Sequence, residues 1–150
     1  MAKSEKQKLK LLYIIQCLME KTDEEHAVTT QEIIDYLALQ GITAERKSIY
    51  TDIDLLIDFG MDIIKKPGRS GGYTLASRQF ELAELKLLVD AVQSSKFITT
   101  KKSRELIGKL ETLCSKYEAT QLHRQVVVTN RNKAINENIY YNVDLSLIHI

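Results

Sequence analysis

The chain has 150 residues, and 21 Lys plus Arg against 20 Asp plus Glu give it a formal net charge of +1. Its 44% hydrophobic and 27% charged residues are typical of a folded, soluble protein and exclude a disordered one. The length suits one ordinary domain or two small ones. The near-neutral charge excludes a protein that coats nucleic acid through bulk charge, so any nucleic-acid site must be local.

The sequence favours a cytoplasmic protein without a membrane partner. The longest apolar run covers residues 11–15, well short of the roughly 20 residues that a membrane-spanning helix needs. Gln16 and Glu20 interrupt the segment that a signal peptide would use as its apolar core. Cys17 and Cys114 are far apart in sequence, which predicts buried thiols in a reducing compartment.

Helical spacing of apolar residues predicts three helices in the first sixty residues. The first covers residues 8–20, and its expected buried stripe is Leu11, Leu12, Ile15, Leu18 and Met19. The second begins after Thr29, a capping residue to which Glu32 can reach back, and ends at Gly41. Its expected buried face is Ile33, Ile34 and Leu37.

The third predicted helix is capped by Thr43 and ends at Gly60. Apolar residues recur on one of its faces, at Ile49, Ile53 and Leu56. Two helices joined through a tight turn that contains glycine form a helix-turn-helix.

Two short β-prone runs follow, residues 61–66 and 73–75, on either side of a Gly-rich turn at 67–72. This pattern predicts a hairpin. Three helices and a basic-tipped hairpin describe a winged helix, so we expect a mainly α protein whose first domain, residues 1–78, is a winged helix-turn-helix.

Apolar stripes predict a helical linker over residues 79–122, which serves either dimerisation or intramolecular packing. Residues 94–100 join its two helices, and residues 123–144 are too few to form a domain. One stripe is Phe80, Leu85, Leu88 and Val92, and the other is Leu106, Ile107, Leu110, Leu113, Cys114 and Tyr117.

Residues that could support catalysis are scarce. His26, His123 and His149 lack the spacing of metal ligands, and the Gly cluster lies in a hairpin rather than at a strand-to-helix turn. The acidic run at 23–25 is typical of a solvated loop. We therefore expect no enzyme, no metal and no cofactor.

The third helix favours contact with double-stranded DNA. Asp54 and Asp58 on its later turns would be repelled by phosphates, so only its N-terminal half should enter the major groove. The residues there that can donate to phosphates or base edges are Arg46, Lys47, Ser48, Tyr50 and Thr51.

The hairpin adds the basic residues Lys65, Lys66 and Arg69, and Arg69 could lie along the minor groove. Residues 1–78 nevertheless hold 11 Lys plus Arg against 12 Asp plus Glu, a net charge of −1. Non-specific affinity should therefore be low and dependent on salt, and we expect a homodimer on a two-fold site.

Several runs of the sequence resemble WYL-domain transcriptional regulators, which are bacterial proteins similar here to the DeoR-type winged helix. Residues 45–56, 59–63 and 71–75 resemble the family's winged helix, and residues 80–88, 95–99 and 106–110 its helical linker. The resemblance covers nearly everything from Lys8 to Asp144.

The resemblance implies that Lys47, Ser48, Tyr50 and Thr51 occupy recognition-helix positions, and that Gly71, Gly72 and Tyr73 belong to the wing. Thr51 departs from the family, which usually has Arg there, so one cation is missing. Asp52 also matches the family motif. Because it lies at the edge of the core on a helical wheel, we expect a pairing or capping role for it.

The domain for which this family is named would follow the linker. The resemblance implies that a small-molecule or nucleotide effector binds only through that domain, and we interpret residues 123–144 as the start of its truncated region. Residues 145–150 can be encoded by CTG-TCT-CTT-ATA-CAC-ATC, which looks like a transposase adapter used in sequencing libraries. We expect these six residues to be a sequencing artefact, with a natural hydrophobic tail as the alternative.

The sequence thus predicts a DNA-binding transcriptional regulator that has lost its effector domain. Two alternatives stay open at this point. The winged helix could be the repressor half of a bifunctional enzyme, as in biotin-ligase-type proteins, or a protein-interaction module that does not bind DNA.

Overall fold

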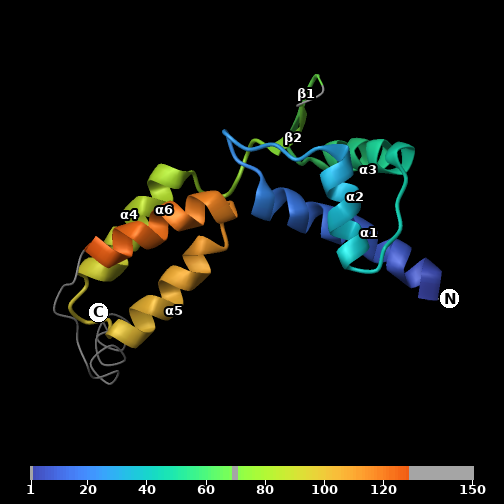
Figure 1. The fold of residues 1–150 in the computed structure, drawn as a ribbon. Coiled ribbons are helices and arrows are strands. Elements are labelled where there is room, and N and C mark those ends of the chain that lie inside the picture. The colour runs from blue at the N-terminus through green and yellow to red at the C-terminus, as the bar shows by residue number, and fades with distance from the viewer. Residues whose placement is uncertain (1, 69–70, 129–150) are drawn as a thin grey trace. The chain divides into compact units, whose positions relative to one another are not determined.

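The computed structural model describes residues 2–68 and 71–128, and its contacts divide the chain into two units with the boundary between Gln79 and Phe80 (Figure 1). The first unit contains three helices followed by a two-stranded antiparallel hairpin, which confirms the predicted winged-helix fold. Its elements are α1 (Ala2–Lys21), α2 (Thr30–Leu39), α3 (Arg46–Phe59), β1 (Ile63–Lys66) and β2 (Gly72–Leu75).

The buried face of α1 differs from the predicted stripe. Leu18 is buried as expected, but Leu12 is 60% exposed and Met19 is 37% exposed. The buried face instead runs through Lys10, Ile14, Cys17 and Leu18. The physical reason is that the face includes a paired lysine, which a hydrophobic pattern counts as a solvent-facing residue.

The chain turns tightly between α2 and α3. Thr29 caps α2 as predicted, because its side chain accepts a hydrogen bond from the Glu32 amide at 3.1 Å. Gly41 follows the helix with a φ of +78°, and the Ile42 amide donates to the Leu37 carbonyl at 2.9 Å. This glycine therefore adopts the left-handed conformation that commonly ends helices.

The predicted cap of α3 is wrong, because the helix begins at Arg46 and Glu45 occupies its N-cap position. Buried Ile42 holds the turn against the core, and the chain stays non-helical through Glu45. The C-terminal end of α3 is as predicted, with Gly60 in the left-handed conformation.

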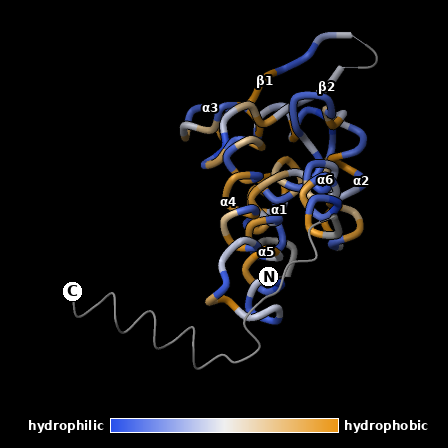
Figure 2. The backbone as a smooth tube through the Cα atoms, turned by 90° about the vertical axis from the view of Figure 1, so that its left-hand side faces the viewer, coloured by the Kyte–Doolittle hydropathy of each residue, from blue (hydrophilic) through white to orange (hydrophobic). Residues whose placement is uncertain are grey.

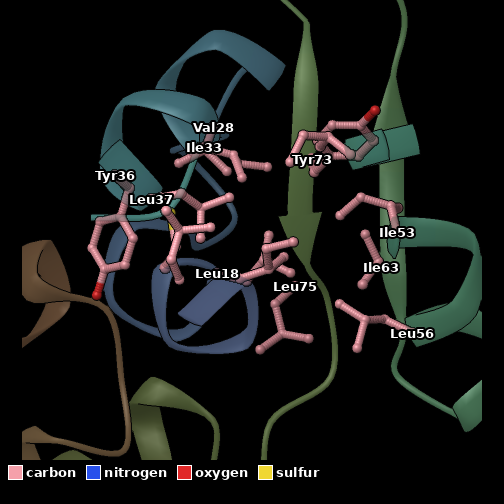
Figure 3. Packing of buried hydrophobic residues seen from close by; sticks show 14 residues of the cluster. Leu18, Val28, Ile33, Tyr36, Leu37, Ile53, Leu56, Ile63, Tyr73 and Leu75 are labelled. Atoms are coloured by element: carbon pink, nitrogen blue, oxygen red, sulfur yellow. The ribbon is translucent and has the colours of Figure 1, made fainter. Parts of the chain in front are cut away.

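The core of the first unit is built by all three helices and both strands. Figure 3 shows labelled side chains from these elements converging, with Tyr73 and Leu75 contributed by β2. In α2 the buried residues are Ile33, Tyr36 and Leu37, so Tyr36 is buried where Ile34 was predicted and Ile34 is only partly buried. Burial also raises the pKa of the Cys17 thiol to about 11, which keeps it protonated.

The hairpin is joined to the rest of the unit through Val28. Ile63 pairs with Leu75 and Lys66 with Gly72 in the antiparallel register. Val28 and Tyr73 exchange two backbone hydrogen bonds, of 2.7 Å and 3.0 Å. Val28 therefore pairs with β2 on the edge opposite β1 and anchors the hairpin to the helices.

Arg78 fixes the chain that leaves the hairpin. Its Nη2 donates to the carbonyls of Met19 at 2.7 Å and Thr22 at 2.6 Å, at the C-terminal end of α1. Thr22 is itself buried, and its side-chain hydroxyl accepts a hydrogen bond from the Leu75 amide at 3.0 Å. The two Arg78 bonds satisfy carbonyls at the end of α1 that the helix leaves without partners.

The second unit consists, in its described part, of α4 (Leu82–Ser94), α5 (Thr100–Glu111) and α6 (Lys116–Val128). Two helices were predicted here, and the single helix expected over 106–117 is wrong because residues 112–115 separate α5 from α6. Leu88 is 37% exposed, and Val89 is buried in its place. The core of this unit is Leu85, Val89, Ile107, Cys114 and Leu122.

Across residues 2–68 and 71–128, none of the helices combines the length and the apolar character needed to cross a membrane. Residues 129–150, which include the predicted adapter-derived segment and most of the region 123–144, lie outside the described residues.

Candidate nucleic-acid interface

Helix α3 presents a polar face to solvent. Its apolar face is buried, since Ile49 and Ile53 are 0% exposed and Leu56 is 4% exposed, as the sequence predicted. Helical geometry therefore turns the intervening residues outward. The exposed polar residues on this helix are Arg46, Lys47, Tyr50, Thr51, Asp54 and Asp58.

The N-terminal half of this face carries the donors. Lys47 is exposed, and its side chain makes no hydrogen bond or ion pair within residues 2–68 and 71–128. Arg46 makes one long hydrogen bond of 3.4 Å to Gln31, and Thr51 donates to the Lys47 carbonyl at 3.1 Å. Tyr50 keeps 45% of its surface exposed. These four side chains are therefore accessible to a ligand in solution.

Ser48 and Asp52 face α1 rather than solvent. Lys10 of α1 donates a hydrogen bond to the Ser48 hydroxyl, and its Nζ lies 2.7 Å from Asp52 Oδ2. The Lys10 side chain is 5% exposed and that of Asp52 is 15% exposed. The predicted pairing role of Asp52 is confirmed, and Ser48 belongs to the same buried polar contact that holds α3 on α1.

The basic end of the hairpin adjoins α3. Lys65 and Lys66 are exposed, and β1 passes from hydrophobic to hydrophilic residues towards the hairpin turn (Figure 2). Lys65 Nζ lies 2.7 Å from Asp54 Oδ1, and this hydrogen bond raises the pKa of Lys65. Arg69, the third basic residue predicted here, lies outside the described residues.

Gly71, Gly72 and Tyr73 hold the hairpin together. A Cβ on Gly72 would lie 2.1 Å from the Val28 carbonyl oxygen, and one on Gly71 would lie 2.1 Å from the Lys66 carbonyl oxygen. These two glycines therefore allow the chain to approach its own backbone. Tyr73 is only 7% exposed and packs in the core, so its ring has a structural role instead of the predicted DNA contact.

A groove of about 450 Å³ lies where α3 begins. It is lined by residues of α1 and of the turn before α3, and its charged lining residues are Lys6 and Glu45. Opposite charges give the groove no strong preference for an anion. In the described ranges, no three His, Cys, Asp or Glu side chains gather closely enough to hold a metal ion.

Comparison with known protein families gives a match in the first unit. Residues 12–68 match the FokI D3 domain, which is a winged-helix-like DNA-binding domain. The match begins in α1 and includes α2, α3 and β1, so it contains the exposed donor face and Lys65. No curated protein and no solved structure matches the chain. From α1 to the hairpin turn, the first unit is therefore similar to a winged-helix-like DNA-binding domain.

Proposed function

We propose that this chain is a sequence-specific regulator of transcription that binds double-stranded DNA through α3 and the hairpin. The observation that carries the proposal is the row of accessible donors on the N-terminal half of α3, inside the segment that matches the FokI D3 domain. Arg46, Lys47 and Tyr50 can donate to phosphates and to base edges, and the Thr51 hydroxyl, which donates to the Lys47 carbonyl, can accept from a base.

The charge distribution on α3 determines how deeply it can enter the major groove. The first turns carry Arg46 and Lys47 at the positive end of the helix dipole, whereas Asp54 and Asp58 lie farther along. Phosphates attract the first group and repel the second. The helix therefore inserts its N-terminal half, and exposed Lys66 of the hairpin contacts the adjoining backbone.

The resemblance to WYL-domain regulators supports a bacterial, cytoplasmic protein whose effector, a small molecule or nucleotide, binds a domain that would follow the linker. In this proposal the chain has no catalytic role and regulates transcription by binding to its DNA site.

The proposed regulator binds as a homodimer, with the exposed face of α4 as the contact between two copies. Leu87 is 70% exposed on that face, next to Leu88 and the exposed Ala91. An antiparallel pairing of two α4 helices about a two-fold axis near Leu87 buries Leu87 and Leu88 of one copy against the same residues of the other. The same face can thus complement itself, as two-fold symmetry requires.

The test is a comparison of Lys47→Ala with Lys109→Ala in the full chain. Lys109 is an exposed lysine of α5, so its replacement removes the same charge outside the first unit. We expect Lys47→Ala to weaken binding to a duplex selected from a random pool by about 1–3 kcal/mol, and Lys109→Ala to leave it unchanged. Failure of the wild-type chain to select any duplex, or equal binding by the wild-type chain and Lys47→Ala, would contradict the proposal.

A second candidate function is a protein-interaction winged helix, because the later turns of α3 also expose apolar residues. Leu55 is 51% exposed and Phe59 is 82% exposed, one helical turn apart. Exposed apolar residues on one face are typical of protein contacts. A stable complex with another protein that Phe59→Ser abolishes, in a chain that selects no DNA, would favour this function.

A further inference from the structure

Asp54 stands on the face of α3 that the proposed function turns towards DNA. It lies seven residues after Lys47 and three after Thr51, so helical geometry places all three side chains on one stripe. A carboxylate at this position repels the phosphate backbone. The structure shows that the same carboxylate has a definite partner, the Lys65 ammonium group at 2.7 Å.

The Asp54–Lys65 pair connects α3 to β1 at the surface. The side chain of Lys65 is 53% exposed and that of Asp54 is 62% exposed. Ion pairs with this exposure contribute little to folding because water and salt screen them. The pair therefore contributes little to the stability of the first unit.

Lys65 can bind a phosphodiester oxygen in the same way as it binds Asp54. Both are anionic oxygen acceptors, and both form charge-assisted hydrogen bonds with an ammonium group. The ammonium group has three donors but a single positive charge, so simultaneous contact with both acceptors weakens each charge-assisted hydrogen bond. Asp54 and a DNA phosphate thus compete for Lys65.

We propose that Asp54 is an internal competitor for the phosphate backbone, which occupies Lys65 and lowers the affinity of the chain for DNA of arbitrary sequence. This inference rests on the proposed DNA-binding function and adds a specificity-determining residue to it. Binding to non-cognate DNA then depends on the other cations, while base contacts from the first turns of α3 support the cognate complex.

The matched control is Asp58, one helical turn beyond Asp54. It is also an exposed aspartate on α3, and it has no ion-pair partner among the residues that the structure describes. Asp54→Asn and Asp58→Asn remove the same charge, but only Asp54→Asn releases Lys65.

The first experiment measures binding of the full chain to a random-sequence duplex as a function of salt. A released Lys65 adds one phosphate contact, so we expect the slope of log K against log salt to steepen by about 0.9 in Asp54→Asn. The affinity advantage of Asp54→Asn should then shrink about threefold between 50 and 200 mM salt. Asp58→Asn should keep the wild-type slope.

A double-mutant comparison identifies Lys65 as the released group. We expect Lys65→Gln to change binding little in the wild-type background and to cancel the gain in the Asp54→Asn background. Nuclear magnetic resonance of the lysine ammonium groups provides a readout without DNA. The Lys65 ammonium protons should exchange with water more slowly in the wild-type chain and in Asp58→Asn than in Asp54→Asn.

The outcomes separate this inference from the proposed function. If neither the wild-type chain nor Asp54→Asn binds any duplex, both proposals are overturned. If the wild-type chain binds DNA but Asp54→Asn and Asp58→Asn have equal salt slopes, only the competitor role of Asp54 is overturned. Equal ammonium exchange at Lys65 in the two variants would overturn that role as well.

Discussion

Lys10 is a buried charge that positions the helix proposed to contact DNA. It is 4% exposed, yet its ammonium group has the Asp52 carboxylate at 2.7 Å and the Ser48 hydroxyl as partners. Both partners lie on α3, so the contact fixes the rotation of α3 about its axis. That rotation is what presents Lys47 and Thr51 to solvent.

Removal of Lys10 should be costly, because it leaves the Asp52 carboxylate largely buried without its cation. We expect Lys10→Met to lower the free energy of unfolding of the first unit by about 3 kcal/mol. The double variant Lys10→Met/Asp52→Leu should return to within about 1 kcal/mol of the wild-type value, because no unpaired charge remains. Urea unfolding followed by circular dichroism measures both. A Lys10→Met variant as stable as the wild-type chain would contradict the structural account.

Sequence patterns predict some of these residues and miss others for physical reasons. The outward positions on α3 follow from its clear apolar stripe, and the pairing of Asp52 follows from its place at the edge of the core. Lys10 is missed because its burial depends on a partner 42 residues away. Tyr73 was assigned to a DNA contact by resemblance, whereas the Val28–Tyr73 backbone pairing draws it into the core.

At the scale of elements, the hairpin depends on the close approach of β2 to Val28. Gly72 permits this approach, because any Cβ there would lie 2.1 Å from the Val28 carbonyl oxygen. Gly108 is the contrasting case, a glycine within α5 whose added Cβ would meet nothing within 4 Å.

Alanine at the two glycines should therefore have opposite effects. We expect Gly72→Ala to destabilise the first unit by about 2 kcal/mol or more, through loss of the two Val28–Tyr73 hydrogen bonds. We expect Gly108→Ala to stabilise α5 by up to about 1 kcal/mol, because alanine favours the helix. Amide hydrogen exchange reports on each unit separately. Unchanged protection of Val28 and Tyr73 in Gly72→Ala would show that the strand contact does not need a glycine.

The division of the second unit into three helices could also have been predicted. Ser115 and Glu118 have the spacing of a capping box, and the Glu118 amide donates to the Ser115 hydroxyl at 3.1 Å. Apolar spacing that continues from Leu106 to Tyr117 obscures this helix start. The Ser115 cap starts a new helix although the apolar spacing continues. The break between α5 and α6 therefore cannot be found from that spacing alone.

At the scale of the whole molecule, the proposed dimer compensates for the small number of phosphate contacts that one copy can make. Residues 1–78 have a net charge of −1, so one copy relies on a few cations on α3 and the hairpin. Two copies on a two-fold site double those contacts.

Leu87→Glu tests the dimer, because it places a charge in the middle of the proposed α4 contact. We expect the wild-type chain to sediment as a dimer and Leu87→Glu to sediment as a monomer that binds the selected duplex more weakly. Leu39→Glu is the matched control, since Leu39 is 82% exposed on α2. A monomeric wild-type chain, or a dimeric Leu87→Glu variant, would rule out this contact.

The most direct test of the central claim is a titration of the isotopically labelled full chain with its selected DNA duplex, followed by amide chemical shifts. We expect the largest shift changes at residues 46–51 of α3 and at Lys66 of the hairpin. The proposed DNA contact would be contradicted if the duplex left those residues unchanged, or if the changes were confined to the later turns of α3 around Leu55 and Phe59.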